Sequence, residues 1–156
     1  MDAGCSTDTG ADTDTGTRGT GRPGVARTFT LSREAPAAAR HFAVGVLRRW
    51  VAAGLADDTG LADDTGLADD AALVVTELAA NAVVHAHSGF TVTLSVPGDV
   101  LRISVRDASP LPSPGVGPAL PPAPLHGLGA VDALASRWGV ESLGNAGKTV
   151  WVDLRR

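Results

Sequence analysis

The chain has 156 residues, 44% of them hydrophobic, and a formal net charge of −4 at pH 7. This length and apolar content suit one folded domain with a single core. No apolar run approaches the roughly 20 residues needed to span a bilayer, and the polar start MDAGCSTDTG lacks the apolar region of a secretory signal. We therefore expect a cytoplasmic protein with no membrane association.

The negative charge is concentrated in two segments. Residues 2–14 hold four Asp and residues 57–70 hold six, which leaves seven acidic against eleven basic residues in the rest of 27–156. This small excess of positive charge suits an anionic ligand or an acidic partner, but the excess is too small to indicate direct nucleic-acid binding. Cys5 is the only cysteine, so neither a disulfide nor a cysteine metal cluster can form within one chain.

The N-terminal part divides into a tail and the start of a domain. Residues 1–26 are mostly Gly, Thr and Asp, with too little apolar surface to offset the entropy of ordering, so we expect a disordered tail and a folded domain over 27–156. RTFTL at 27–31 reads as a strand. A helix then runs from about Ser32 to Ala53, since Pro36 is tolerated in a first turn.

A tandem acidic hexapeptide, LADDTG, occupies residues 55–70. We interpret it as a surface loop whose last aspartates, Asp69 and Asp70, cap the next helix, because carboxylates stabilise the positive end of a helix dipole. That helix covers roughly 69–86. Its expected buried stripe consists of Leu73, Val74, Leu78, Ala82 and Val83.

The C-terminal half reads as strands around a loop. TVTLSV and VLRISVRD alternate apolar and polar residues on either side of a Pro-Gly-Asp turn, which predicts a hairpin. The proline-rich segment 108–126 is expected to be a loop or lid. A short helix at 127–137 and strands at 138–142 and 148–154 complete an α/β fold, an α+β two-layer sandwich with helices on one face of a mostly antiparallel sheet.

Three polar residues of the second helix, Glu77, Asn81 and His85, fall four residues apart and therefore project in a row. A solvated polar face is the alternative explanation. Asn81 favours a functional role, because Asn is a poor residue for a helix interior.

Two further features point to an anionic ligand. Asp107 ends a predicted strand, and the segment Gly127, Leu128 and Gly129 opens a helix. Free backbone N–H groups beside glycines at a helix start suit a phosphate chain. Each feature alone is weak, because Asp is common in turns and a lone G-x-G is common in loops.

Together these segments, ELAANAVVHA, VRDASP, HGLGAVDALASRWGV and GKTVWVDL, resemble in order and spacing the GHKL (HATPase_c) superfamily, and especially its RsbW-type anti-sigma-factor serine/threonine kinases. The resemblance covers about residues 28–155. It implies a Bergerat-type ATP-binding fold that takes ATP and Mg²⁺. Its expected partners are a sigma factor and an anti-anti-sigma (STAS) protein, and a homodimer is common in the family.

The resemblance also implies roles for individual residues. Glu77 would be the general base for phosphoryl transfer, and Asn81 would be a ligand of Mg²⁺. Asp107 would accept a hydrogen bond from the adenine amino group, and Thr149 would lie near the adenine pocket beside it. The backbone of the segment 127–129 (Gly127, Leu128 and Gly129) would bind the phosphates, and His85 would pack against or line the pocket.

The chain departs from the family pattern in its glycine box and lid. Leu125 replaces the first glycine, His126 replaces a basic residue, and the lid carries no charge. These changes motivate an alternative to the kinase, a non-catalytic partner-switching protein with weak or no nucleotide binding. A purely structural α/β module with coincidental motifs is the third alternative.

Overall fold

The computed structural model describes residues 24–53, 65–110 and 129–155. In these ranges the chain forms five strands and three α-helices, with a π-helical turn and a 3₁₀ turn. In chain order they are β1 (Val25–Phe29), α1 (Ala35–Ala52), α2 (Thr65–Asn81), the π turn (Ala82–Ala86), β2 (Phe90–Ser95), β3 (Val100–Asp107), α3 (Gly129–Leu134), β4 (Arg137–Ser142), the 3₁₀ turn (Gly144–Ala146) and β5 (Lys148–Arg155).

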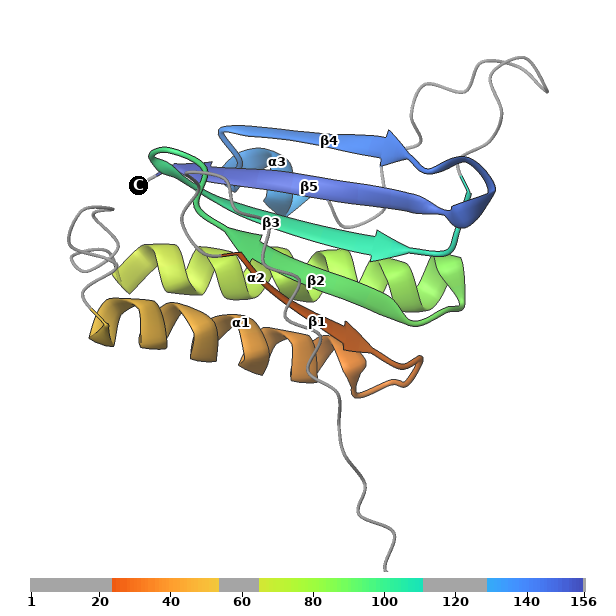
Figure 1. Cartoon of the computed structure of the whole chain (residues 1–156), viewed down its shortest axis with the longest axis horizontal. Helices are drawn as coiled ribbons and strands as arrows, with labels where there is room; N and C mark the ends of the chain where they lie inside the picture. Colours follow the sequence, from red (N-terminus) through yellow and green to blue (C-terminus); the bar gives the residue numbers. More distant parts are fainter. Residues whose placement is uncertain (1–23, 54–64, 111–128, 156) are drawn as a thin grey trace, which may run out of the picture.

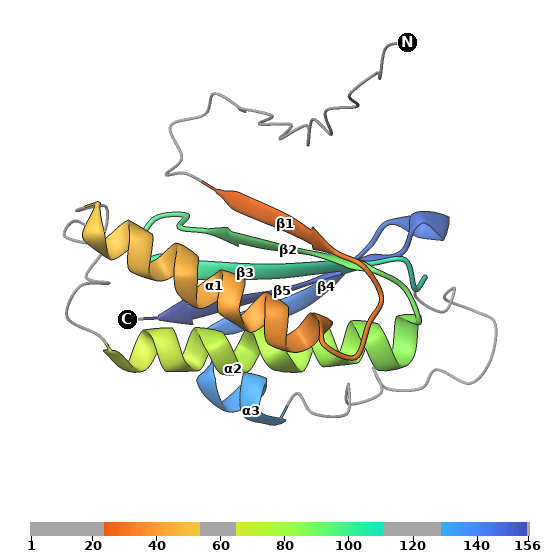
Figure 2. The ribbon, with the colours of Figure 1, turned by 90° about the horizontal axis from the view of Figure 1, so that it is seen from below.

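The strands form one sheet in the order β1-β2-β3-β5-β4, and every neighbouring pair is antiparallel. Helices α1 and α2 lie side by side across one face of this sheet, and α3 packs beside α2 (Figures 1 and 2). The predicted α+β two-layer sandwich is therefore confirmed.

The core lies between the sheet and the helices because the central strands alternate strictly. In β2 and β3 the apolar side chains face the helices, while Thr, Ser and Arg face the opposite side. This is the pattern that the sequence predicted for the hairpin. The buried residues of these two strands, together with the residue that follows β2, are Phe90, Val92, Leu94, Val96, Leu101, Ile103, Val105 and Asp107.

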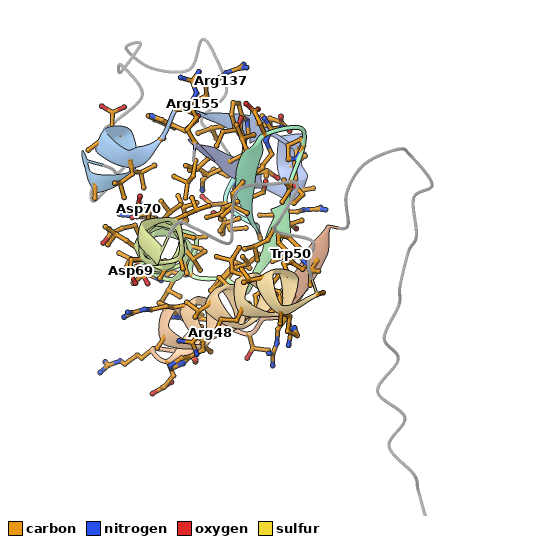
Figure 3. All side chains as sticks on the ribbon, turned by 90° about the vertical axis from the view of Figure 1, so that its left-hand side faces the viewer. Arg48, Trp50, Asp69, Asp70, Arg137 and Arg155 are labelled. Atoms are coloured by element: carbon orange, nitrogen blue, oxygen red, sulfur yellow. The ribbon has the colours of Figure 1, made fainter. Side chains whose placement is uncertain are left out.

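Small residues on α1 and α2 allow the two helices to approach closely. Ala39 and Ala43 of α1 and Ala71 and Ala79 of α2 are fully buried. Trp50 closes one end of the core from the last turn of α1, as the view along the helices shows (Figure 3). A fully buried Val, Leu, Ile, Phe or Met side chain in such a core contributes about 1.5–3 kcal/mol in transfer free energy.

The outer face of the sheet is held by a charged pair. Asp153 of β5 accepts hydrogen bonds from the Arg102 guanidinium of β3, with Nε 2.7 Å from Oδ1 and Nη2 2.8 Å from Oδ2. These bonds raise the pKa of Arg102, against an opposing effect of burial. Arg102 also stacks on the ring of Trp151.

Two sequence-based boundaries and one predicted core position are wrong. The sheet begins at Val25 and not at 27, so the end of the predicted tail belongs to β1. Helix α2 begins at Thr65, because Leu67 of the last acidic repeat is buried in the core. Leu73 is 42% exposed, and the buried face of α2 instead uses Val75 in the next position.

Most of the predicted loops lie outside the described residues. These are residues 1–23 of the tail, 54–64 of the repeat and 111–128 of the lid and glycine box. Within the described ranges, no helix is long and apolar enough to cross a membrane.

Candidate functional site

Helix α2 and strand β3 end, and strand β5 begins, at the same side of the molecule (Figure 1). A hollow opens there between α2 and the sheet. The hollow is partly open to solvent. Its lining combines three apolar and four polar side chains, namely Leu78, Val105, Val150, Asn81, His85, Asp107 and Lys148.

The helical wall of the hollow changes geometry at Asn81. The α-helix ends there and continues as the π turn Ala82–Ala86, which closes at His87 with a left-handed backbone (φ 47°). Such π turns are rare and are frequently found at functional sites. Asn81 and His85 both line the hollow, whereas Glu77 does not.

The side-chain amide of Asn81 has no hydrogen-bond partner among the described residues. Its Nδ2 atom is buried without a hydrogen-bond partner, and nothing in the described part of the chain bonds to its Oδ1, which stays accessible. Buried polar atoms without partners are uncommon in folded proteins. The side chain therefore offers an accessible oxygen and an unused N–H group at the site.

Asp107 is the buried acidic group of the site, only 5% exposed at the end of β3. Its Oδ1 atom accepts two hydrogen bonds, from the Ser109 backbone N–H at 2.8 Å and from Lys148 Nζ at 3.0 Å. Its Oδ2 atom forms no hydrogen bond with the described residues. One carboxylate oxygen is thus committed to the protein, and the other is left for a ligand.

Lys148 is the buried basic group, 8% exposed at the start of β5, and sequence analysis did not single it out. It lies directly opposite Asp107 in the antiparallel pairing of β3 and β5. Strand alternation could have revealed its burial, because Lys148 and the apolar Val150 lie two residues apart and therefore share a face of the sheet.

The predicted neighbour of the adenine pocket, Thr149, does not line the hollow. It pairs with Arg106 on one side and Glu141 on the other, on the face of the sheet opposite to Lys148. The reason is the two-residue period of a strand, which sends adjacent side chains to opposite faces. This expectation is corrected: Lys148 takes the position beside Asp107.

The predicted phosphate-binding segment is only partly described. Gly129 is exposed at the first position of α3, with open space where a side chain would stand. Helix α3 is fixed to the body by Val131, which is fully buried, and by its contact with α2. Gly127 and Leu128, together with Leu125 and His126, lie outside the described residues.

Glu77 lies one turn before Asn81 on α2 and is half-buried. It forms no hydrogen bond or ion pair with the described residues. Among those residues there is also no group of three His, Cys, Asp or Glu side chains that would hold a metal ion by itself. A cation at this site would depend on oxygen atoms of its ligand, as Mg²⁺ commonly does with phosphates.

Helices covering one face of a five-stranded antiparallel sheet form an RsbW-like fold. Among solved structures, the chain is similar to the RsbU and RsbW domains of Rv1364c from Mycobacterium tuberculosis, with 23% sequence identity and a TM-score of 0.57. The similarity covers 85% of this chain and 32% of that chain, so this chain spans about a third of the matched one.

Comparisons of sequence alone find no match. No protein-family model matches the chain. No curated protein matches it either. The solved structure confirms, at the level of the fold, the resemblance inferred from the four motifs.

Proposed function

We propose that the protein is an ATP-binding regulator that phosphorylates a serine or threonine of an anti-anti-sigma (STAS) partner and binds a sigma factor. One observation carries the proposal. Asp107 and Asn81 open onto the same hollow, each with an oxygen atom that no described residue engages. The RsbW-type fold supports the same class of regulator.

Two polar residues of the hollow, Asp107 and Asn81, have direct places in ATP binding. Asp107 Oδ2 accepts a hydrogen bond from the adenine amino group, and the apolar side chains of Leu78, Val105 and Val150 contact the ring. Asn81 Oδ1 is an oxygen donor of the kind that Mg²⁺ prefers. Mg²⁺, when bound with ATP, neutralises charge on the phosphate oxygens. The backbone of 127–129 binds the phosphates.

Glu77 is the proposed general base. Its carboxylate has no partner in the described part of the chain and lies one helical turn from Asn81, so it would receive the proton of the attacking hydroxyl close to the metal-bound phosphates. A base in this role must come within hydrogen-bond reach of that hydroxyl when the partner protein is bound. Its position outside the hollow suits a group that meets a macromolecular substrate.

A second candidate function is partner binding without phosphoryl transfer. The observation in its favour is that Glu77 does not line the hollow, so no described residue holds it against a ligand there. In this case nucleotide would control which partner is bound, and no phosphoprotein would form.

Calorimetric titration with ATP and ADP in the presence of Mg²⁺ tests the shared part of both functions. Saturable binding at micromolar to millimolar nucleotide is expected, and absence of binding would reject the ATP-binding proposal. Incubation of the protein with Mg-ATP and the STAS protein that copurifies with it then separates the two functions. Phosphorylation of the STAS protein supports the kinase, and stable exchange of partners without phosphorylation supports the second candidate.

A further inference from the structure

The ammonium of Lys148 has donors that the protein does not use. Lys148 is the only lysine of the chain, and its side chain lies in the hollow at 8% exposure. One of its three N–H groups donates to Asp107 Oδ1, at 3.0 Å. No other hydrogen bond links it to the described residues. Because buried ammonium groups are costly unless their donors are satisfied, the remaining N–H groups call for an acceptor in the hollow.

The hollow therefore presents a donor and an acceptor next to each other. Ser109 N–H and Lys148 Nζ both bind Asp107 Oδ1, which leaves Oδ2 as the free acceptor beside the Lys148 ammonium. Leu78, Val105 and Val150 supply apolar contact around this polar pair. Such a lining matches a flat ring whose edge carries an N–H group next to an unprotonated nitrogen.

We propose that Lys148 reads the base of the bound nucleotide together with Asp107, an inference that rests on the proposed binding of ATP in this hollow. Adenine presents its exocyclic amino group beside a ring nitrogen acceptor, N7 on one edge and N1 on the other. The amino group donates to Asp107 Oδ2, and the adjacent ring nitrogen accepts from Lys148 Nζ. A carboxylate alone would recognise only the amino group.

This assignment makes Lys148 a specificity-determining residue. It also fixes the position of Asp107, because the ion pair and the Ser109 N–H hold the carboxylate by one oxygen, Oδ1. Asp107 and Lys148 thus act as one unit, because the loss of either side chain changes the hydrogen-bonding groups that the other offers to the base.

The test compares four nucleotides by calorimetry on the full-length protein with Mg²⁺: ATP, the triphosphates of 1-deazaadenosine and 7-deazaadenosine, and that of purine riboside, which lacks the amino group. Wild-type protein is expected to bind one deaza analogue about tenfold more weakly than ATP, since a hydrogen bond from a charged donor is lost. The purine riboside nucleotide is expected to bind more weakly by a similar factor.

Variants test whether Lys148 causes the difference in affinity between ATP and the deaza analogue. Lys148→Met is expected to bind ATP about tenfold more weakly and to bind ATP and the sensitive deaza analogue equally. Lys148→Arg keeps a donor and is expected to retain part of the discrimination. Arg106→Met is the control. Arg106 directly precedes Asp107 in β3 and faces the other side of the sheet, so removing its positive charge is expected to leave nucleotide binding as in wild type.

Three results would overturn the proposal. Equal binding of ATP and both deaza analogues by wild-type protein excludes a contact from Lys148, and this measurement needs no variant to fold. Tighter binding of ATP by folded Lys148→Met means that the ammonium obstructs the site. Failure of every nucleotide to bind wild-type protein rejects the proposed function itself, and the role of Lys148 with it.

Discussion

Gly147 lies against the backbone of Asp107, so closely that a Cβ atom at position 147 would overlap the Asp107 carbonyl oxygen. Its backbone is also in the left-handed region, with φ 113°. The close approach brings the start of β5 against the end of β3 and so places Lys148 opposite Asp107. The geometry of the polar pair therefore depends on a glycine at the preceding position.

Gly147→Ala is expected to destabilise the protein by about 2 kcal/mol or more, because backbone strain and a steric overlap add. Urea unfolding measures this loss. Gly144→Ala is the matched control in the same turn, since Gly144 also has a positive φ (61°) but has open space at its Cβ position. It is expected to lose only about 1 kcal/mol. Equal losses would contradict the proposed close approach.

Asp107→Asn is expected to cost about 3 kcal/mol of stability, because it leaves the buried ammonium of Lys148 without a counter-charge. Lys148→Met leaves the carboxylate unpaired and is expected to cost a similar amount. The double variant should be more stable than the sum of the two losses predicts, by at least about 1 kcal/mol. Additive losses in urea unfolding would show that the two groups do not interact.

Asn81→Ala is expected to weaken binding of Mg-ATP while leaving binding of ATP in EDTA nearly unchanged, because only the metal contact is removed. The measurement is calorimetry with and without Mg²⁺. Leu73→Ala, an exposed change on the same helix, serves as the control and should match wild type in both conditions. An equal loss with and without Mg²⁺ would argue against Asn81 as a metal ligand.

Glu77→Gln is expected to lower phosphorylation of the STAS partner by at least about 100-fold, with ATP affinity retained, because it removes the base but keeps the shape of the side chain. A single-turnover assay with excess protein separates this effect from product release. Transfer at the wild-type rate would remove Glu77 from the mechanism.

The sheet could be predicted from the sequence because strand alternation in β2 and β3 is unbroken. Helix α2 was harder. Its apolar residues occupy every position from Ala71 to Val75, so the sequence pattern did not distinguish the exposed Leu73 from the buried Val75. The start of the helix was missed because an acidic repeat reads as a loop, although its Leu67 packs in the core.

The candidate site was predicted in part. Asn81 and Asp107 line one hollow, which fits their spacing in the sequence. Lys148 was missed because a lone lysine after a Gly-rich turn is usually exposed. Its burial depends on the register of β5 against β3, a pairing across 41 residues that no local pattern specifies. The same register moves Thr149 to the outer face.

The most direct test of nucleotide binding in the hollow uses the single lysine. Selective ¹⁵N labelling of lysine gives one side-chain ammonium signal in an NMR spectrum, and that signal belongs to Lys148. Titration with Mg-ATP is predicted to shift it saturably, with the same affinity that calorimetry reports. An ammonium signal that stays unchanged while calorimetry shows ATP bound would place the nucleotide elsewhere and contradict the site.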